Sequence, residues 1–491
     1  MSKTIGAIGA TDVQGWQEQL GGFSSYTVAR NAATSAGVRA AAKNPLPWRT
    51  YHDTYSVSLS PTGEVTNQRQ SGRCWLFSAL NVVRDRMMSA LGTSSLELSQ
   101  AYLQFWDKLE KSNTFLSEMV RLADRPIDDR EVVMWLQEPA SDGGWWDSAA
   151  ALIQKYGVVP HDCMPDTANS RATSDMNDAL FRKLREDALI LRKSVASMTE
   201  GELAATRDSM MAEVYRILAV SLGEPPARFS LEYVADARKG EDKKDEAEGS
   251  QGEGADKPAA GSYEALAAKK AEKAQVEGFT RIEDVTPLEF LQTYGHVDMA
   301  DFVNIGNLPG EARPYGAILQ MDNQTSLVGV PVRMLNMPIQ VMKDALICQL
   351  KAGHPAWMAC DVTKNMDRSD KTGLLDTKTL DIEGLFGMDF AIAKEDAFDL
   401  REAELNHAMT FQGVNLDSDG KPTAWRVENS WGKDACKDGY FIITDRWFDA
   451  YVGQAIIHRD YLPADVVALW DGADTPVIHV APWAPMFGIS D

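Results

Sequence analysis

The hydrophobic pattern of this chain changes its period near residue 300. Before that point, apolar residues recur at steps of three and four, the spacing of one helix face, as at Leu76, Leu80, Val83, Met87 and Leu91. After that point, short segments rich in β-branched and aromatic residues are separated by Gly, Asp or Pro, which is typical of strands. We therefore predict an α+β fold in which a helical half precedes a β-rich half.

The strand-like segments of the second half are short and well separated. We predict strands at residues 355–362, 408–414, 424–428 and 439–444, and one around Met334. Two of them are flanked by polar residues of interest, because His407 directly precedes one and Asn429 directly follows another.

Composition and charge restrict the partners of the protein. At 491 residues, 44% of them hydrophobic, the chain can build a large core, and its net charge of −22 repels nucleic acid and anionic membranes. Five scattered cysteines suggest no disulfide framework, which fits a reducing compartment. No run of about 20 apolar residues occurs, so the sequence indicates neither a membrane span nor a secretory signal. We expect a cytoplasmic protein that binds neither membrane nor nucleic acid.

The texture of the sequence divides the chain into segments. We expect residues 1–60, which are turn-rich, to form an arm that packs on something else. Residues 61–160 are expected to form a helical lobe, 161–300 a helical insertion and 301–480 a β-rich lobe. Within the insertion, residues of about 238–276 have hardly any apolar side chains, so burial cannot offset their ordering entropy, and we predict a partly disordered acidic loop.

A polar, Gly-containing run stops at Cys74, where the helical pattern begins. A thiolate at a helix start is stabilised by unpaired N–H groups and by the helix dipole, which favours a lowered thiol pKa. Gln68 lies just upstream, where its side-chain N–H could face the oxygen of a carbonyl under attack. The simpler interpretation of a lone cysteine here is a buried packing residue.

Thiol chemistry also needs a base and a group that orients the base. His407 at a strand start and Asn429 at a strand end can supply both, since an Asn oxygen accepts from one imidazole nitrogen and leaves the other toward the thiol. Trp431 could cover this contact and exclude water. Taken singly, His407 fits a core histidine and Asn429 a turn residue.

The order Gln, Cys, His, Asn and its local contexts resemble papain-type cysteine peptidases, and more narrowly the bleomycin hydrolase/aminopeptidase C family. The likeness covers nearly the whole chain. The stretches that carry it are Gln68-Arg-Gln-Ser-Gly-Arg-Cys74-Trp-Leu-Phe, Asn406-His407-Ala408-Met409, Trp425-Arg-Val-Glu-Asn429-Ser-Trp-Gly432, Phe105-Trp-Asp-Lys108 and Asp142-Gly-Gly-Trp-Trp-Asp147. The resemblance implies a papain-like fold of two lobes with a large, mainly helical insertion.

The resemblance also implies roles for single residues. Cys74 corresponds to the nucleophile, His407 to the general base and acid, Asn429 to the residue that orients His407, and Gln68 to the oxyanion-hole side chain. The implied reaction is peptide hydrolysis through a thioester, without a cofactor or metal.

Asp142, Gly143, Gly144 and Trp145 resemble the wall along which the backbone of a peptide substrate lies. From the local sequence, we expect Asp147 or Ser148 to cap the helix that follows this wall. Similar proteins form hexameric rings whose active sites face an inner cavity, which implies a homo-hexamer acting on short or unfolded peptides.

The tail, residues 481–491, resembles the family's Trp-x-Pro-Met ending, which lies in the active-site cleft. There the terminal carboxylate pairs with the free amino group of a substrate and makes the enzyme an aminopeptidase. In this chain Phe487 is inserted relative to that pattern, and Asp491 adds a second carboxylate at the tip. The specificity therefore differs from the family's unless trimming restores the register.

Two other functions remain open on the sequence alone: an endopeptidase of the same fold whose tail does not block the cleft, and a non-enzymatic ring-shaped scaffold. The complete set of four active-site residue types disfavours the scaffold. A metal site at Cys348, His354 and Cys360 is disfavoured because their spacing does not match tight zinc pairs.

Overall fold

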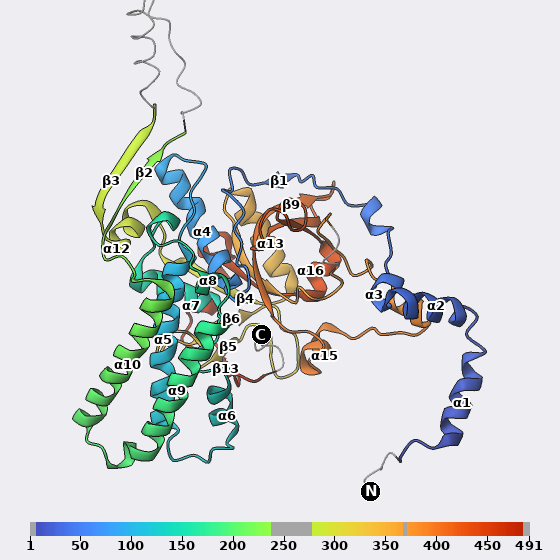
Figure 1. Ribbon diagram of the computed structural model, residues 1–491. Helices are drawn as coiled ribbons and strands as arrows, with labels where there is room; N and C mark the ends of the chain where they lie inside the picture. Colours follow the sequence, from blue (N-terminus) through green and yellow to red (C-terminus); the bar gives the residue numbers. More distant parts are fainter. Residues whose placement is uncertain (1–5, 237–276, 367–370, 485–491) are drawn as a thin grey trace, which may run out of the picture.

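The computed structural model describes residues 6–236, 277–366 and 371–484 of the chain (Figure 1). The loop predicted at about 238–276 lies outside these residues, and Asp491 lies outside them as well. Within the described residues, no helix is both long and apolar enough to cross a bilayer.

The central helix of the first half is α4, Cys74–Leu91, and it begins at the residue that the hydrophobic pattern indicates. Leu76, Leu80 and Val83 are buried in the large apolar cluster of the helical half, as predicted. Other helices form the rest of the helical half in Figure 1. They are α5 (Gln100–Arg121), α6 (Arg130–Gln137), α7 (Trp146–Tyr156), α8 (Ala168–Arg171), α9 (Ser174–Ser194), α10 (Glu200–Leu222) and α12 (Pro287–Phe290).

The N-terminus of α7 differs from the prediction. Trp145 occupies the capping position without a side-chain cap, and Asp147 lies inside the first turn. Asp147 accepts a hydrogen bond from the side chain of Asn304 at 3.1 Å and faces the sheet. The expectation that Asp147 or Ser148 caps this helix is therefore wrong, because contacts between the helix and the sheet take the carboxylate away from the helix end.

The second half builds one mixed sheet with strand order β13-β5-β6-β4-β12-β7-β9-β10-β11-β8, and β1 pairs with β9. Four strands lie where they were predicted: β7 (Ala356–Cys360), β9 (His407–Leu416), β10 (Pro422–Glu428) and β11 (Tyr440–Thr444). The segment around Met334 is β6 (Val332–Asn336). The others are β1 (Val57–Ser58), β4 (Phe302–Gly306), β5 (Ile318–Met321), β8 (Leu374–Leu375), β12 (Val452–His458) and β13 (Val477–His479).

The sequence analysis does not predict β4 and β12, two central strands of the sheet. Each carries a buried polar residue that interrupts its apolar pattern, Asn304 in β4 and Gln454 in β12. The Gln454 amide donates to the Asn304 side-chain oxygen at 2.8 Å across the two strands. This buried contact pairs the Gln454 N–H with the Asn304 oxygen, and the two polar residues make the strands look like loop sequence.

Helices also cover parts of the β-rich half. In Figure 1, α13 (Ile339–Lys351) and α16 (Asp445–Tyr451) lie against the sheet. Short helices α14 (Ile382–Phe386), α15 (Lys394–Asp399) and α17 (Ala464–Asp471) complete this half. In the insertion, β2 (Phe229–Val234) and β3 (Phe279–Val285) form a separate antiparallel pair, which the expectation of a mainly helical insertion does not include.

The N-terminal segment extends away from the rest of the molecule in Figure 1. Its helices α1 (Ala10–Leu20), α2 (Tyr26–Ala36) and α3 (Val38–Ala41) bury no residue. Apolar side chains on these helices are exposed, including Trp16 at 51% and Val28 at 72%. Nothing within the described chain covers these side chains.

Two sets of contacts bring the halves together at one place. The α4 hydroxyl of Ser78 donates to the carbonyl of Met409 in β9 at 2.6 Å. The loop before α4 pairs with the segment after β10, through a bond of 2.7 Å from the amide of Gln68 to the carbonyl of Ser430. The start of α4, the start of β9 and the end of β10 therefore meet.

Candidate active site

A cleft of about 1180 Å³ opens where the two halves meet. The helical half contributes Gln68, Cys74 and the segment 143–145 to its lining, and the β-rich half contributes His407 and Trp431. Residues from α6 and from the segment 321–325 line it as well, together with Pro482 from the tail. The residues predicted for catalysis thus lie at or directly beside one cavity, although they are more than three hundred positions apart in the sequence.

Cys74 is the first residue of α4, and it is half-buried in the lining of the cleft. Burial raises the pKa of the Cys74 thiol, and this outweighs the lowering caused by backbone hydrogen bonds at Ala408, Trp75 and Cys74 itself. The expectation that the helix start alone lowers the pKa is therefore wrong. Since Ala408 follows His407, the sulfur lies beside the first residues of β9.

His407 and Asn429 form a buried pair, at 7% and 1% exposure. Imidazole Nε2 of His407 lies 2.9 Å from Oδ1 of Asn429. The same oxygen accepts the backbone N–H of Ser430 at 2.8 Å, which identifies it as the oxygen of the amide. Nε2 is consequently the donor, so proton exchange between imidazole and thiol would use Nδ1.

The indole of Trp431 shields this pair from solvent. Its ring centroid lies 5.1 Å from that of His407, at an angle of 38° between the planes. A hydrogen bond covered in this way is stronger than one exposed to water. The position of Trp431 agrees with the role predicted for it.

Gln68 lies at the edge of the cleft with 8% of its surface exposed. Its Nε2 donates to the carbonyl of Ser71 at 2.7 Å, and its Oε1 accepts from the hydroxyl of Ser430 at 2.6 Å. One of the two amide hydrogens is used by Ser71, and the second remains for an oxyanion. The side chain links the loop before Cys74 to the segment after Asn429, which fixes its orientation.

The predicted substrate wall contributes unequally to the cleft. Gly143, Gly144 and Trp145 line it, whereas Asp142 does not. At Gly144 a Cβ atom would lie 2.5 Å from Cε2 of Trp75, so only glycine fits where this backbone crosses the indole.

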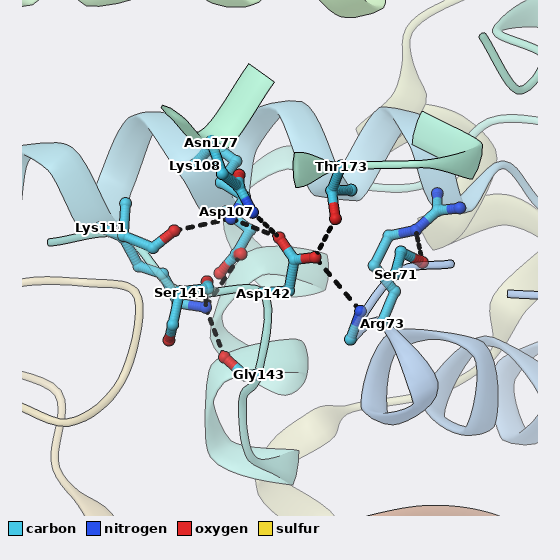
Figure 2. Close-up of polar contacts among 12 residues, drawn as sticks. Ser71, Arg73, Asp107, Lys108, Lys111, Ser141, Asp142, Gly143, Thr173 and Asn177 are labelled. Carbon is cyan, nitrogen blue, oxygen red and sulfur yellow. Dashed lines mark hydrogen bonds and ion pairs between the residues drawn. The ribbon is translucent and has the colours of Figure 1, made fainter. Parts of the chain in front are cut away.

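The carboxylate of Asp142 instead lies behind the wall, 2.6 Å from Nζ of Lys108 (Figure 2). Burial by itself would raise the pKa of Asp142, but the ammonium of Lys108 and hydrogen bonds from Thr173 and Asn177 hold it well below its usual range. The structure therefore places the carboxylate of Asp142 in a supporting position behind the wall, outside the lining of the cleft.

Several cleft residues were not identified from the sequence. Lys111 of α5 is the most notable, because its buried amino group lies under the substrate wall and over the ring of Trp75, 5.3 Å from the ring centroid. The available signal is that Lys108 and Lys111 stand three positions apart on the helix face that also carries Phe105 and Phe115. Charge pairs at this spacing usually lie on solvated faces, so the signal is weak.

No cluster suited to a metal ion occurs in the parts of the chain that the structure describes, counting groups of three or more His, Cys, Asp or Glu. All five cysteines are free thiols. The groups at hand in the cleft are a thiol, an imidazole oriented by an amide, and amide N–H donors. Such a set can carry out nucleophilic acyl transfer.

The last described residues run along the cleft. Pro482 lines it, and the backbone carbonyl of Trp483 accepts a hydrogen bond of 2.8 Å from Arg401. The guanidinium of Arg130 lies over the indole of Trp483, 4.8 Å from its centroid. Two arginines, one from each half, therefore hold the chain where it reaches the cleft.

Comparison with known proteins agrees with this geometry. Residues 7–248 and 272–487 match the Peptidase C1-like family. The chain is 36% identical to Aminopeptidase C of Lactobacillus delbrueckii subsp. lactis over 478 residues, covering 96% of each, and 34% identical to Aminopeptidase C of Listeria innocua, covering 92% of this chain and 91% of that one. The crystal structure of PepW from Lactobacillus rhamnosis HN001 superposes with a TM-score of 0.86 at 36% identity, covering 98% of both chains.

Proposed function

Because the chain belongs to the Peptidase C1-like family and is a cysteine peptidase of the aminopeptidase C type, we propose that it removes N-terminal residues from short peptides through a thioester on Cys74. The observation that carries this proposal is the imidazole of His407, oriented by Asn429 at 2.9 Å, on the wall of the cleft that contains Cys74. The α+β fold expected from the sequence is confirmed.

The first half-reaction begins with proton transfer from the thiol of Cys74 to Nδ1 of His407. The imidazolium stabilises the thiolate and opposes the effect of burial on the thiol pKa. The thiolate then attacks the carbonyl carbon of the N-terminal residue. The oxyanion accepts from the remaining N–H of Gln68 and from the backbone N–H of Cys74. His407 returns the proton to the leaving amine, and a thioester remains.

Water completes the reaction. Nδ1 of His407 takes a proton from water, the hydroxide adds to the thioester, and the thiolate leaves as the second product forms. Throughout, Asn429 keeps the imidazole in one tautomer and one orientation, because its oxygen only accepts. His407 finally returns its proton to the thiolate of Cys74, so the thiol and the imidazole regain their starting states.

We assign the selection of substrates with a free amino terminus to the tail. Trp483 is anchored by Arg130 and Arg401, and seven residues follow Ala484. Seven residues can span up to about 24 Å, and we propose that they bring a terminal carboxylate into the cleft beside Cys74. A fixed anion there would attract an ammonium and would exclude longer chains by its bulk.

The test compares an aminoacyl 4-nitroanilide with the same compound after N-acetylation. Hydrolysis of the free amine with little turnover of the acetylated compound supports an aminopeptidase. Comparable turnover of both would show an endopeptidase, the second possibility, which is favoured by the insertion of Phe487 and by the extra carboxylate of Asp491. Mass spectrometry of the intact protein, run in parallel, shows whether residue 491 is the actual terminus.

The proposal extends to assembly and location. The exposed apolar side chains of the arm, such as Trp16 and Val28, fit contacts with further copies of the chain, and we propose a homo-hexamer that admits short or unfolded peptides. Five free thiols fit a reducing cytosol. Sedimentation of the full chain and of a form without residues 1–41 tests the assembly, and cell fractionation tests the location.

A further inference from the structure

Lys111 donates from α5 to the backbone of the cleft wall (Figure 2). Its Nζ donates to the carbonyl of Ser141 at 2.8 Å, to the carbonyl of Gly143 at 2.5 Å and to the carboxylate of Asp107 at 3.0 Å. An ammonium has three N–H groups, so these three acceptors saturate it. Although Lys111 lines the cleft, it therefore has no donor left for a substrate.

Two further side chains hold the neighbouring carbonyls of the same loop. Lys108 donates to the carbonyl of Ala140 at 2.6 Å, and the indole of Trp75 donates to the carbonyl of Asp142 at 2.9 Å. The four consecutive carbonyl groups of residues 140–143 are thus all held by side chains of α4 and α5. Loops normally leave such groups to water, so this degree of fixation is unusual.

Asp142 links this fixed loop to the loop that precedes Cys74. Its carboxylate, held by Lys108, accepts the backbone N–H of Gly72 at 3.2 Å. At Gly72 a Cβ atom would lie 2.8 Å from Cβ of Asp142, so the two backbones approach as closely as glycine allows. Gly72 is two residues before Cys74, and both Gly72 and Gly143 line the cleft.

We propose that Lys108, Lys111 and Asp142 are positioning residues that fix the backbones of Gly72 and Gly143 as the surface on which the acyl residue of the substrate lies. This rests on the proposed function, because it takes Cys74 as the nucleophile. A residue whose carbonyl is attacked by Cys74 must lie close to Gly72, and Gly143 lies beside Gly72, with its backbone N 3.5 Å from where a Cβ of Gly72 would be. The network acts on the substrate only through these two backbones.

The buried charges of Lys111 and Asp107 hold each other in one arrangement. Lys111 is 12% exposed and its partner Asp107 is 2% exposed, and Asp107 also accepts a hydrogen bond from Ser326. Burial lowers the pKa of Lys111, and the charge of Asp107 opposes that shift. Buried charges of this kind keep a defined geometry, because moving either one leaves the other unpaired.

The experiment measures two properties of Lys111→Met. One is kcat and KM for an aminoacyl 4-nitroanilide, and the other is the rate at which iodoacetamide inactivates the enzyme. Iodoacetamide is small and needs only the thiol, so it reports on the reactive pair without the wall. We expect KM to rise at least tenfold, kcat to stay within about threefold, and the inactivation rate to stay within about twofold.

Three further variants complete the design. Lys111→Arg keeps the charge and several donors and should recover part of the lost affinity. Asp107→Asn combined with Lys111→Met removes the unpaired buried carboxylate and should show the same rise in KM if the single variant folds poorly. Lys193→Met, an exposed lysine at the end of α9, is the matched control and should behave as the wild type.

An unchanged KM in both Met-containing variants would overturn the proposal. A parallel loss of turnover and of inactivation would also overturn it, because the lysine would then maintain the fold of the whole site. The proposed function fails in a different way: the wild type would not lose activity when iodoacetamide modifies Cys74, which peptide mass spectrometry detects.

Discussion

The two walls of the cleft are built on different principles. The wall formed by β9 and β10 presents functional side chains, with His407 held by Asn429 through one hydrogen bond and covered by Trp431. The opposite wall presents backbone at Gly143 and Gly144, and its charged side chains lie behind it. One wall supplies the group that transfers protons, and the other supplies the nucleophile Cys74 and a rigid backbone surface beside it.

The two walls differ in how readily they can be recognised from a sequence. A group that transfers a proton must reach the reacting atoms, so its identity is visible as a residue type in a local motif. A backbone surface is positioned by whatever lies beneath it. In this protein that is a saturated ammonium on a neighbouring helix, which any sequence pattern would assign to solvent.

The largest effect should come from removing the nucleophile. Cys74→Ala should lower hydrolysis of an aminoacyl 4-nitroanilide by at least about 10⁴-fold, because what remains is substrate binding without covalent chemistry. Its thermal unfolding should match the wild type, and Cys348→Ala, at an exposed thiol, is the matched control with full activity. Retained turnover in Cys74→Ala would show that Cys74 is not the nucleophile.

The loss of activity should differ between substitutions of His407 and of Asn429. His407→Ala should cost about 10³-fold or more, since it removes the base and acid, whereas Asn429→Ala should cost about 10- to 100-fold, since it removes only the orientation. Steady-state rates with one substrate give both values. Equal losses, or a larger loss for Asn429→Ala, would contradict the division of roles.

The sequence predicts the reactive side chains much better than the backbone surface at Gly143 and Gly144. His407 and Asn429 stand at the ends of two strands whose short apolar runs are recognisable, and Cys74 begins a helix with a regular apolar face. Asp142 was expected at the ligand, but it lies behind the wall because Lys108 offers its carboxylate a buried partner. The thiol pKa was also misjudged, since burial at a cleft wall is not encoded locally.

The tail offers a way to change specificity without touching either wall. Removal of residues 488–491 should raise hydrolysis of an N-acetylated peptide relative to the free amine by about tenfold or more, because it draws the terminal carboxylate back to Phe487 and removes the bulk of the tip. The control exchanges Asp491 for Asn at full length, which keeps the terminal carboxylate. If the shortened enzyme keeps its strict need for a free amine, the tail does not select it.

The smallest effect concerns Asp147, which follows the backbone wall in α7. Burial raises the pKa of Asp147 to about 7, so its protonated form is favoured by the fold. The stability gained from this proton is fully present below the unfolded pKa of about 4 and is lost as pH rises through about 7. Asp147→Asn should therefore flatten the fall in unfolding free energy between pH 5 and 8, by on the order of 1–4 kcal/mol.

Urea unfolding at several pH values measures this slope, and comparison of slopes removes any constant effect of the substitution. Asp162→Asn, at a fully exposed carboxylate, is the matched control and should leave the slope unchanged. An identical slope in Asp147→Asn and the wild type would show that the buried carboxylate beside the wall titrates normally.

The central claim is that Cys74 and His407 act as one pair, in spite of burial that raises the pKa of the thiol. It is tested most directly by the rate of Cys74 alkylation by iodoacetamide as a function of pH, in the wild type and in His407→Gln. We predict that the wild type reacts down to roughly pH 6, whereas the variant reacts only once the solution is strongly alkaline. Superimposable profiles for the two proteins would contradict the claim.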